Sequence, residues 1–187
     1  TPSRNAHGDS LMSDVTTNAL RGLVKTLSDV VAPAILEYDP LAFQELKMTV
    51  RYLSFCRERV EHLYARARYE LSFYNKLARD CSQLLGPKNH MHADGMTVLC
   101  KSADALMNQP GAAIGALREQ TQELMSRLTH LLGEIEDAAV LSKVEKAIVT
   151  ASAEMTAFER SWYLPLKLER FPAQVRPLKN FIPMHPN

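Results

Sequence analysis

The feature that most constrains this chain is a run of apolar residues spaced alternately four and three apart between Leu46 and Leu85. Such spacing places side chains along one side of an α-helix that packs lengthwise against other helices. Arg57 is the one charged residue in the run. Asp39 and Pro40 have the residue types of a helix start, and Gly86 follows as a stop signal. The pattern predicts one continuous helix over 40–85, roughly 70 Å long at 1.5 Å per residue.

The rest of the chain repeats helical spacing, with no alternating pattern typical of strands. One ladder covers 96–107 and ends near Pro110, where a helix must bend or restart. Two further ladders cover 117–138 and 141–162, and the spacing slips between them. A reversal there and an uninterrupted helix with a stammer both fit this slip. A weaker amphipathic pattern over 12–30 predicts a fourth helix of the bundle.

We therefore expect an all-α fold, an elongated antiparallel bundle of three to four long, kinked helices in a coiled-coil-like rod. Residues 9–170 are expected to form this single domain, after a flexible N-terminus at 1–8. Four prolines in 171–187 predict an extended C-terminal tail. The residues expected along the seam of the bundle are Leu46, Val50, Leu53, Val60, Tyr64, Leu71, Tyr74, Leu85 and Trp162.

Composition argues against several classes of function. The net charge of +1 gives no global field that would attract nucleic acid, and we expect no nucleic-acid partner. No run of about 18 apolar residues is present. The three cysteines are widely spaced and odd in number, which favours free buried thiols in a reducing compartment. We therefore expect a cytoplasmic protein, with peripheral attachment to a membrane left open.

No arrangement of residues predicts catalysis. Nucleophile-elbow, phosphate-loop and dinucleotide-binding motifs are absent from the sequence, so we expect no enzyme activity. His90, His92 and Asp94 lie close together, but they lack the four-residue spacing of a helical metal site. We interpret them as a solvated turn and expect neither a metal nor another cofactor.

The charge distribution is more informative. Eight Lys or Arg residues face five acids over 40–86, so the long helix and the C-terminal part together predict a basic face. An ordinary solvated coat of charges remains the alternative. Arg57 should pair with an acid of another helix or extend its charged head out of the bundle. The cations expected to face solvent, and a membrane or partner, are Arg59, Arg66, Lys76, Arg79, Lys167 and Arg170.

The long helix resembles the first helix of a BAR domain, particularly the sorting-nexin type. The similarity rests on an acidic and aromatic opening at Asp39 and Phe43, on the seam, and on matching positions that run from Arg68 to Gly86. These matching positions within the run are Arg68, Glu70, Leu71, Lys76, Leu77, Ala78, Leu84, Leu85 and Gly86. The segment 153–171, rich in Phe, Glu and Arg, is similar to the closing helix of that domain. The resemblance covers about half of the chain, and the second and third helices are shorter than in the family.

The resemblance implies a non-enzymatic module that forms homo- or hetero-oligomers through its helical faces and shapes or sorts membranes. Its ligand would be an anionic membrane, contacted by cations worth about 1 kcal/mol each near the surface. The alternative from another class is a cytosolic scaffold or adaptor subunit of a larger complex that contacts no lipid. The sequence leaves these two functions open.

Overall fold

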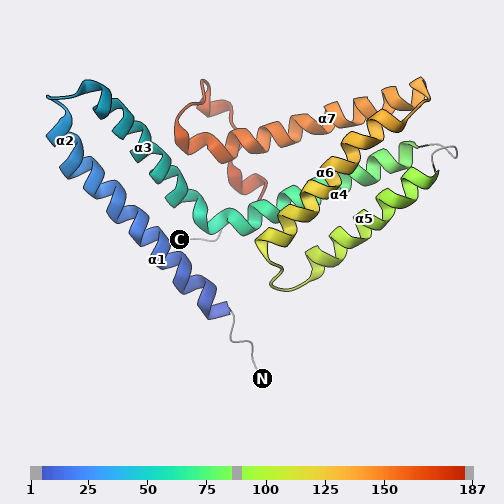
Figure 1. Cartoon of the computed structure of the whole chain (residues 1–187), viewed down its shortest axis with the longest axis horizontal. Helices are drawn as coiled ribbons and strands as arrows, with labels where there is room; N and C mark the ends of the chain where they lie inside the picture. Colours follow the sequence, from blue (N-terminus) through green and yellow to red (C-terminus); the bar gives the residue numbers. More distant parts are fainter. Residues whose placement is uncertain (1–5, 86–89, 184–187) are drawn as a thin grey trace. The chain divides into compact units, whose positions relative to one another are not determined.

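The computed structural model describes the backbone of residues 6–85 and 90–183, and the side chains of residues 15–85 and 93–183. These residues form helices joined by turns and contain no strand, which confirms the all-α prediction (Figure 1). The α-helices are α1 (Ala6–Thr26), α2 (Ala32–Ile35), α3 (Pro40–Arg59), α4 (Leu63–Leu84), α5 (His90–Asn108), α6 (Ile114–Glu134) and α7 (Ala138–Tyr163). A π-helical turn (Leu27–Val31) precedes α2. Short 3-10 turns occupy Val60–His62, Leu164–Leu166, Pro172–Gln174 and Leu178–Asn180.

Two helix starts are explained by aspartate caps. The Asp39 carboxylate accepts a hydrogen bond from the Ala42 N–H at 2.9 Å, and Pro40 opens α3, as the sequence predicts. Asp137 accepts from the N–H groups of Ala139 and Val140 at 2.9 and 3.2 Å. This second cap separates α6 from α7, so the uninterrupted-helix alternative over 111–163 is wrong.

The prediction of one continuous helix over 40–85 is also wrong, because a 3-10 turn at Val60–His62 divides α3 from α4. Side chains three residues apart line up in 3-10 geometry. Arg59 and His62 have this separation, and both are buried although both are polar. The 3-10 turn therefore coincides with a place where two polar side chains on one side of the chain are buried.

The chain divides into two compact units by its internal contacts. Unit 1 comprises 1–62 and 160–175, and unit 2 comprises 63–159 and 176–187. The sequence pattern gave no signal for this division, which falls inside the single domain expected over 9–170. The flexible stretch expected at 1–8 lies mostly outside the described residues, since α1 begins at Ala6.

Unit 2 contains a core built by α4, α5, α6 and the first half of α7. Its fully buried side chains include Leu71, Ala78, Cys81, Met96, Ala103, Leu117, Leu124, Leu131 and Val144. The helix α5 begins at His90, several residues before the ladder from which the sequence predicts it, so the turn expected at His90, His92 and Asp94 is wrong. The restart near Pro110 is confirmed, because α5 ends at Asn108 and α6 begins at Ile114.

Residues 176–183 belong to unit 2 and pack within it, so this part of the expected C-terminal tail is not extended. Leu178 and Ile182 are buried, and Phe181 contacts the rings of Tyr69 and Phe158 at centroid distances of 5.9 and 5.5 Å. The Arg176 guanidinium lies 4.0 Å from the centre of the Phe181 ring. The expectation of an extended tail considered only the prolines, whereas the aromatic and apolar residues between them form buried contacts.

Unit 1 is organised differently, around a hairpin of α1 and α3 with α2 at its tip (Figure 1). Arg59 is the only buried side chain between residues 15 and 60. The apolar residues of the hairpin are half-buried at best, and large ones such as Val15, Leu41 and Val30 are more than 60% exposed. Over residues 15–60, the two helices therefore pair without burying an apolar side chain of their own.

None of the described helices is both long enough and apolar enough to cross a lipid bilayer.

Candidate functional site

The most distinctive site of unit 1 is a groove of about 500 Å³ that follows α3. Its apolar lining comes from Ala32, Phe43, Leu46, Val50 and Pro165. Its polar lining comes from Ser28, Lys47, Arg51, Ser54, Arg57, Glu58 and Lys167. Four cations and one carboxylate thus surround an apolar floor, within the part of the chain that the structure describes.

Arg59 holds the end of α7 beside α3 and so shapes one end of this groove. Its Nε donates to the carbonyl oxygen of Trp162 at 2.8 Å, and its Nη2 donates to the carbonyl oxygen of Ser161 at 3.3 Å. These are carbonyls of the last helical turn, which have no partner within the helix and lie at the negative end of its dipole. Burial lowers the pKa of the Arg59 guanidinium from its usual value.

Aromatic contacts strengthen the same junction. The Trp162 ring lies 5.4 Å from the Arg59 guanidinium and meets Phe55 edge-on at 6.5 Å. Tyr163 stacks on Phe55 at 5.5 Å. These contacts fix the position from which the chain enters the turn Leu164–Leu166 and brings Lys167 to the groove.

Lys167 has a backbone conformation that is unusual for a lysine. Its φ of 56° and ψ of 33° lie in the left-handed region, and it is the one described non-glycine residue with positive φ. The Lys167 N–H donates to the Leu164 carbonyl oxygen at 3.0 Å and closes the turn. Strained backbone of this kind occurs preferentially at functional sites, which makes Lys167 a residue of interest.

No described carboxylate forms an ion pair with the cations of the groove. Lys47, Arg51, Arg57 and Lys167 form no ion pair with a described residue, although Lys47 lies 5.4 Å from the centre of the Phe43 ring. Elsewhere ion pairs are common, and the cations that form them are Lys25, Arg66, Lys76, Arg79, Arg127, Arg160 and Arg176. The groove therefore gathers positive charge that no described carboxylate pairs with.

The structure places the predicted solvent-facing cations in different environments. The prediction is wrong for Arg59, which is 9% exposed because two backbone carbonyls and an aromatic ring enclose it. Lys76 and Arg79 are exposed and paired with Asp80 and Asp104. Lys167 and Arg170 are exposed, and both belong to unit 1.

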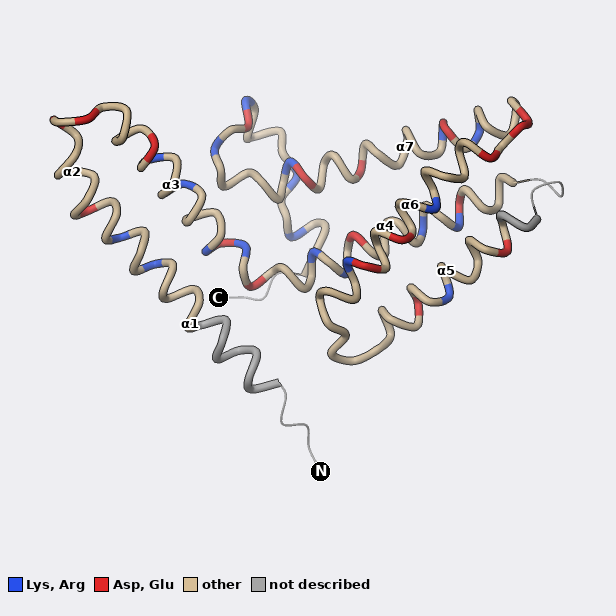
Figure 2. The backbone as a smooth tube through the Cα atoms, viewed as in Figure 1, with Lys and Arg blue, Asp and Glu red and all other residues tan. Residues whose placement is uncertain are grey.

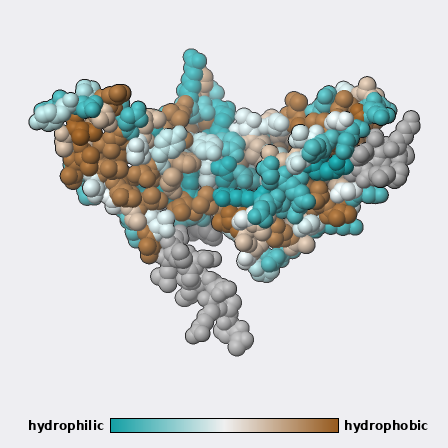
Figure 3. Space-filling model, viewed as in Figure 1, coloured by the Kyte–Doolittle hydropathy of each residue, from teal (hydrophilic) through white to brown (hydrophobic). Residues whose placement is uncertain are grey.

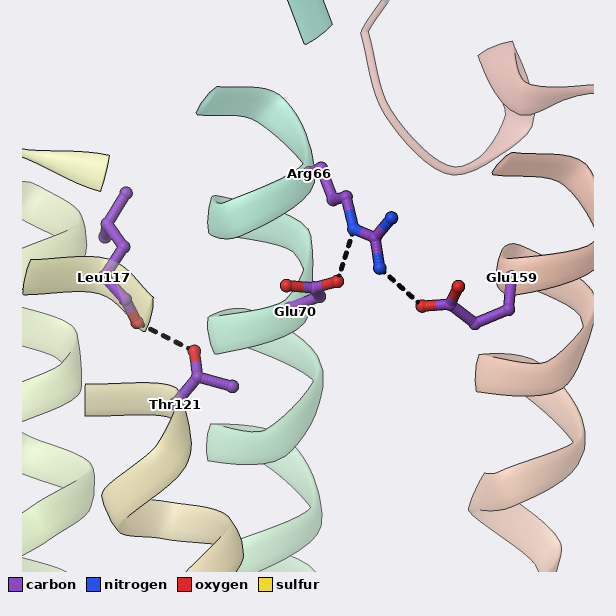
Figure 4. A network of polar contacts seen from close by, with 5 residues as sticks. All are labelled: Arg66, Glu70, Leu117, Thr121 and Glu159. Carbon is purple, nitrogen blue, oxygen red and sulfur yellow. Dashed lines mark hydrogen bonds and ion pairs between the residues drawn. The ribbon is translucent and has the colours of Figure 1, made fainter. Parts of the chain in front are cut away.

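Arg66 is half-buried in an ion-pair network of unit 2 (Figure 4). It donates to Glu70 at 2.6 Å and to Glu159 at 2.9 Å. Burial raises the pKa of the Glu159 carboxyl, and the charge of Arg66 opposes this shift without cancelling it. The groove beside this network has a volume of about 560 Å³ and contains two arginines and two glutamates, so it has no excess charge. Beside it, the Thr121 hydroxyl donates to the Leu117 carbonyl oxygen at 2.8 Å (Figure 4).

The nine seam residues are buried to different degrees. Leu71 and Trp162 are buried, and the remaining seven, Leu46, Val50, Leu53, Val60, Tyr64, Tyr74 and Leu85, are half-buried. Arg57 is half-buried and lines the groove, with no ion pair to a described residue.

Thiols and histidines give no sign of chemistry among the described side chains. Cys81 and Cys100 are free and buried, whereas Cys56 is exposed, contrary to the expectation of buried thiols. Burial raises the pKa of Cys81 to about 11, so its reactive thiolate is scarce at neutral pH. No three His, Cys, Asp or Glu residues gather as metal ligands within the described part of the chain. The side chains of His90 and His92 lie outside that part.

Unit 1 also exposes apolar residues at helical spacing on both arms of the hairpin, and we call this set the outer stripe. Its members are Val15, Leu23 and Val30 before the tip of the hairpin, and Leu41, Met48 and Tyr52 on α3. The α3 members are offset by about half a helical turn from the groove residues Phe43, Val50 and Ser54, so they lie on the opposite side of α3. Hydrophobic side chains gather over this hairpin on the face shown in Figure 3.

No family model, curated protein or solved structure matches this chain.

Proposed function

We propose that the protein is a non-enzymatic helical module that associates with a second copy of itself through the α1–α3 hairpin, and so acts as a dimerisation or scaffold element. The observation that carries this proposal is the absence of a buried apolar side chain over the described residues 15–60. Helices stabilised by packing normally bury one apolar side. A partner that covers the outer stripe would supply the missing layer.

The energy available from such pairing is sufficient. Full burial of a Val, Leu or Met side chain contributes about 1.5–3 kcal/mol. Each copy offers six outer-stripe residues that are between 38% and 73% exposed. Even at half of that value per residue, the summed contribution of the twelve side chains in two copies lies above most of the range of about 4–15 kcal/mol given for the cost of association. Two hairpins that pair in this way would form a four-helix arrangement.

The charge pattern favours a second copy as the partner. Residues 15–62 contain six Lys or Arg residues and six Asp or Glu residues, so two copies meet without net repulsion. Four of these acids, Asp29, Glu37, Asp39 and Glu45, lie toward the tip, and Glu58 and Glu61 lie at the far end of α3 (Figure 2). Antiparallel pairing about a twofold axis would set the acidic tip of one hairpin toward the cations in the middle of the other.

Membrane binding receives less support from the same geometry. Of the six cations expected to contact an anionic bilayer, Arg59 is buried and Arg66, Lys76 and Arg79 have carboxylate partners. The acidic tip would be repelled by anionic headgroups. Protein–protein association is therefore the function that the described contacts favour.

Sedimentation velocity tests the proposal. We expect the wild-type protein to dimerise with rising concentration, and the double variant Leu23→Glu/Tyr52→Glu to remain monomeric with unchanged helix content. The matched control is Val149→Glu in unit 2, since Val149 is 71% exposed and lies outside the hairpin. A wild-type protein that stays monomeric at high concentration would exclude self-association. Co-sedimentation of that monomer with anionic vesicles would favour the membrane function.

A further inference from the structure

We propose that the groove of unit 1 is a binding site for a single-chain amphiphile with an anionic headgroup, such as a fatty carboxylate or an alkyl phosphate. This site is separate from the self-association surface, because the groove residues and the outer stripe lie on opposite sides of α3. The inference therefore stands or falls independently of dimerisation.

The groove offers both apolar and cationic contacts along its length. Ala32, Phe43 and Leu46 line the part near the tip of the hairpin, where α2 packs on the start of α3, and Ser28 and Lys47 line the same part. Arg57 and Lys167 line the other end beside Glu58 and Pro165, where the turn Leu164–Leu166 packs on α3. An alkyl chain would lie against the apolar residues, and its headgroup would reach the two cations.

Its dimensions suit an extended alkyl chain. The α3 lining residues run from Phe43 to Glu58, which corresponds to roughly 22 Å at 1.5 Å per residue. Volumes of about 300–1,000 Å³ are usual for small-molecule sites.

The charge of the groove selects the sign of the headgroup. Four cations face a single carboxylate, Glu58, and none of the four is paired with a described residue. Arginine side chains recognise carboxylate and phosphate groups through paired hydrogen bonds, which a lysine cannot provide. Arg51 and Arg57 are both half-buried, so their contacts with a headgroup would be screened less than those of a fully exposed cation. The strained turn at Lys167 adds a third donor at the same end.

Isothermal titration calorimetry of the full chain with monomeric dodecanoate provides the test. We expect saturable binding of one dodecanoate per chain, similar binding of dodecyl phosphate, and at least tenfold weaker binding of neutral dodecyl maltoside. Acetate and inorganic phosphate, which lack the alkyl chain, should not bind measurably. Binding should weaken as salt rises.

Variants locate the binding in the groove. Arg51→Gln/Arg57→Gln should weaken dodecanoate binding at least tenfold. Lys76→Gln changes an exposed cation of unit 2 and should leave binding unchanged. Arg51→Lys/Arg57→Lys keeps the charge but loses the paired hydrogen bonds, so its affinity should lie between those of the wild type and the glutamine variant. An unchanged helix content in circular dichroism controls for the folding of both variants.

Three results would overturn the inference. The first is equal affinity for dodecanoate and dodecyl maltoside, and the second is unchanged dodecanoate binding by a folded Arg51→Gln/Arg57→Gln variant. The third is binding of an acidic peptide such as hexaglutamate without binding of dodecanoate, which would assign the groove to an extended protein segment.

Discussion

Truncation of Arg59 to alanine should destabilise unit 1 by about 3–4 kcal/mol. A hydrogen bond from a charged donor contributes about 1.5–3 kcal/mol. The bond to Trp162 at 2.8 Å belongs in the middle of this range, and the bond to Ser161 at 3.3 Å belongs at its lower end. The contact with the Trp162 ring adds about 0.5–1 kcal/mol. The cost of burying the guanidinium, which also lowers its pKa, reduces the total by about 1 kcal/mol.

The assay uses the single tryptophan of the chain, which is the residue that Arg59 holds. Urea unfolding followed by Trp162 fluorescence should show a lower midpoint for Arg59→Ala, with the slope against urea unchanged. Arg57→Ala provides a matched control two residues away, and its effect should stay within about 0.5 kcal/mol because Arg57 lines an open groove. An Arg59→Ala midpoint equal to that of the wild type would refute the argument that this arginine stabilises the junction of α3 with the end of α7.

Three further predictions concern other parts of the chain. Leu71→Ala should lower the free energy of unfolding of unit 2 by about 2–5 kcal/mol in calorimetry, because Leu71 is fully buried, and an effect below about 1 kcal/mol would contradict its place in the core. Lys167→Gly should be about 1 kcal/mol more stable than Lys167→Ala in urea unfolding, because glycine adopts positive φ without the steric clash of a Cβ atom. Equal stabilities of the two variants would mean that the backbone at this position is not strained. The pKa of Glu159 is raised in the folded state, so its contribution to stability should increase as pH falls from above that raised pKa to below the pKa of the unfolded state. Glu159→Gln should remove this contribution, and an identical dependence of the melting temperature on pH in both proteins would count against it.

Local sequence signals predicted much of the helical structure. Asp39 and Pro40 start α3 as their residue types indicate, and the interval around Pro110 separates α5 from α6. Leu71 lies in the core that its spacing predicts. These successes share one physical basis, since caps, breakers and apolar periodicity act within a few residues of their own position.

The features that sequence analysis missed depend on distant residues. Arg59 has the sequence neighbours of a solvated arginine, and two of its hydrogen-bond acceptors, the carbonyl oxygens of Trp162 and Ser161, lie more than 100 residues away. The excess charge of the groove was equally hidden, because Lys47, Arg51 and Arg57 look like an ordinary solvated helix until the positions of the carboxylates are known. One local signal was overlooked: Asp137 stands before an alanine-rich segment and caps α7. The resemblance to BAR domains stays a prediction.

Hydrogen exchange measured at several protein concentrations tests most directly the claim that the α1–α3 hairpin is completed by a second copy. Dimerisation stabilises the paired state by mass action, so protection of the interface should fall on dilution. We predict that amides of α1 and α3 exchange faster after about 100-fold dilution, whereas amides of α4 and α6 keep their rates. Exchange rates in α3 that do not depend on concentration would contradict the account.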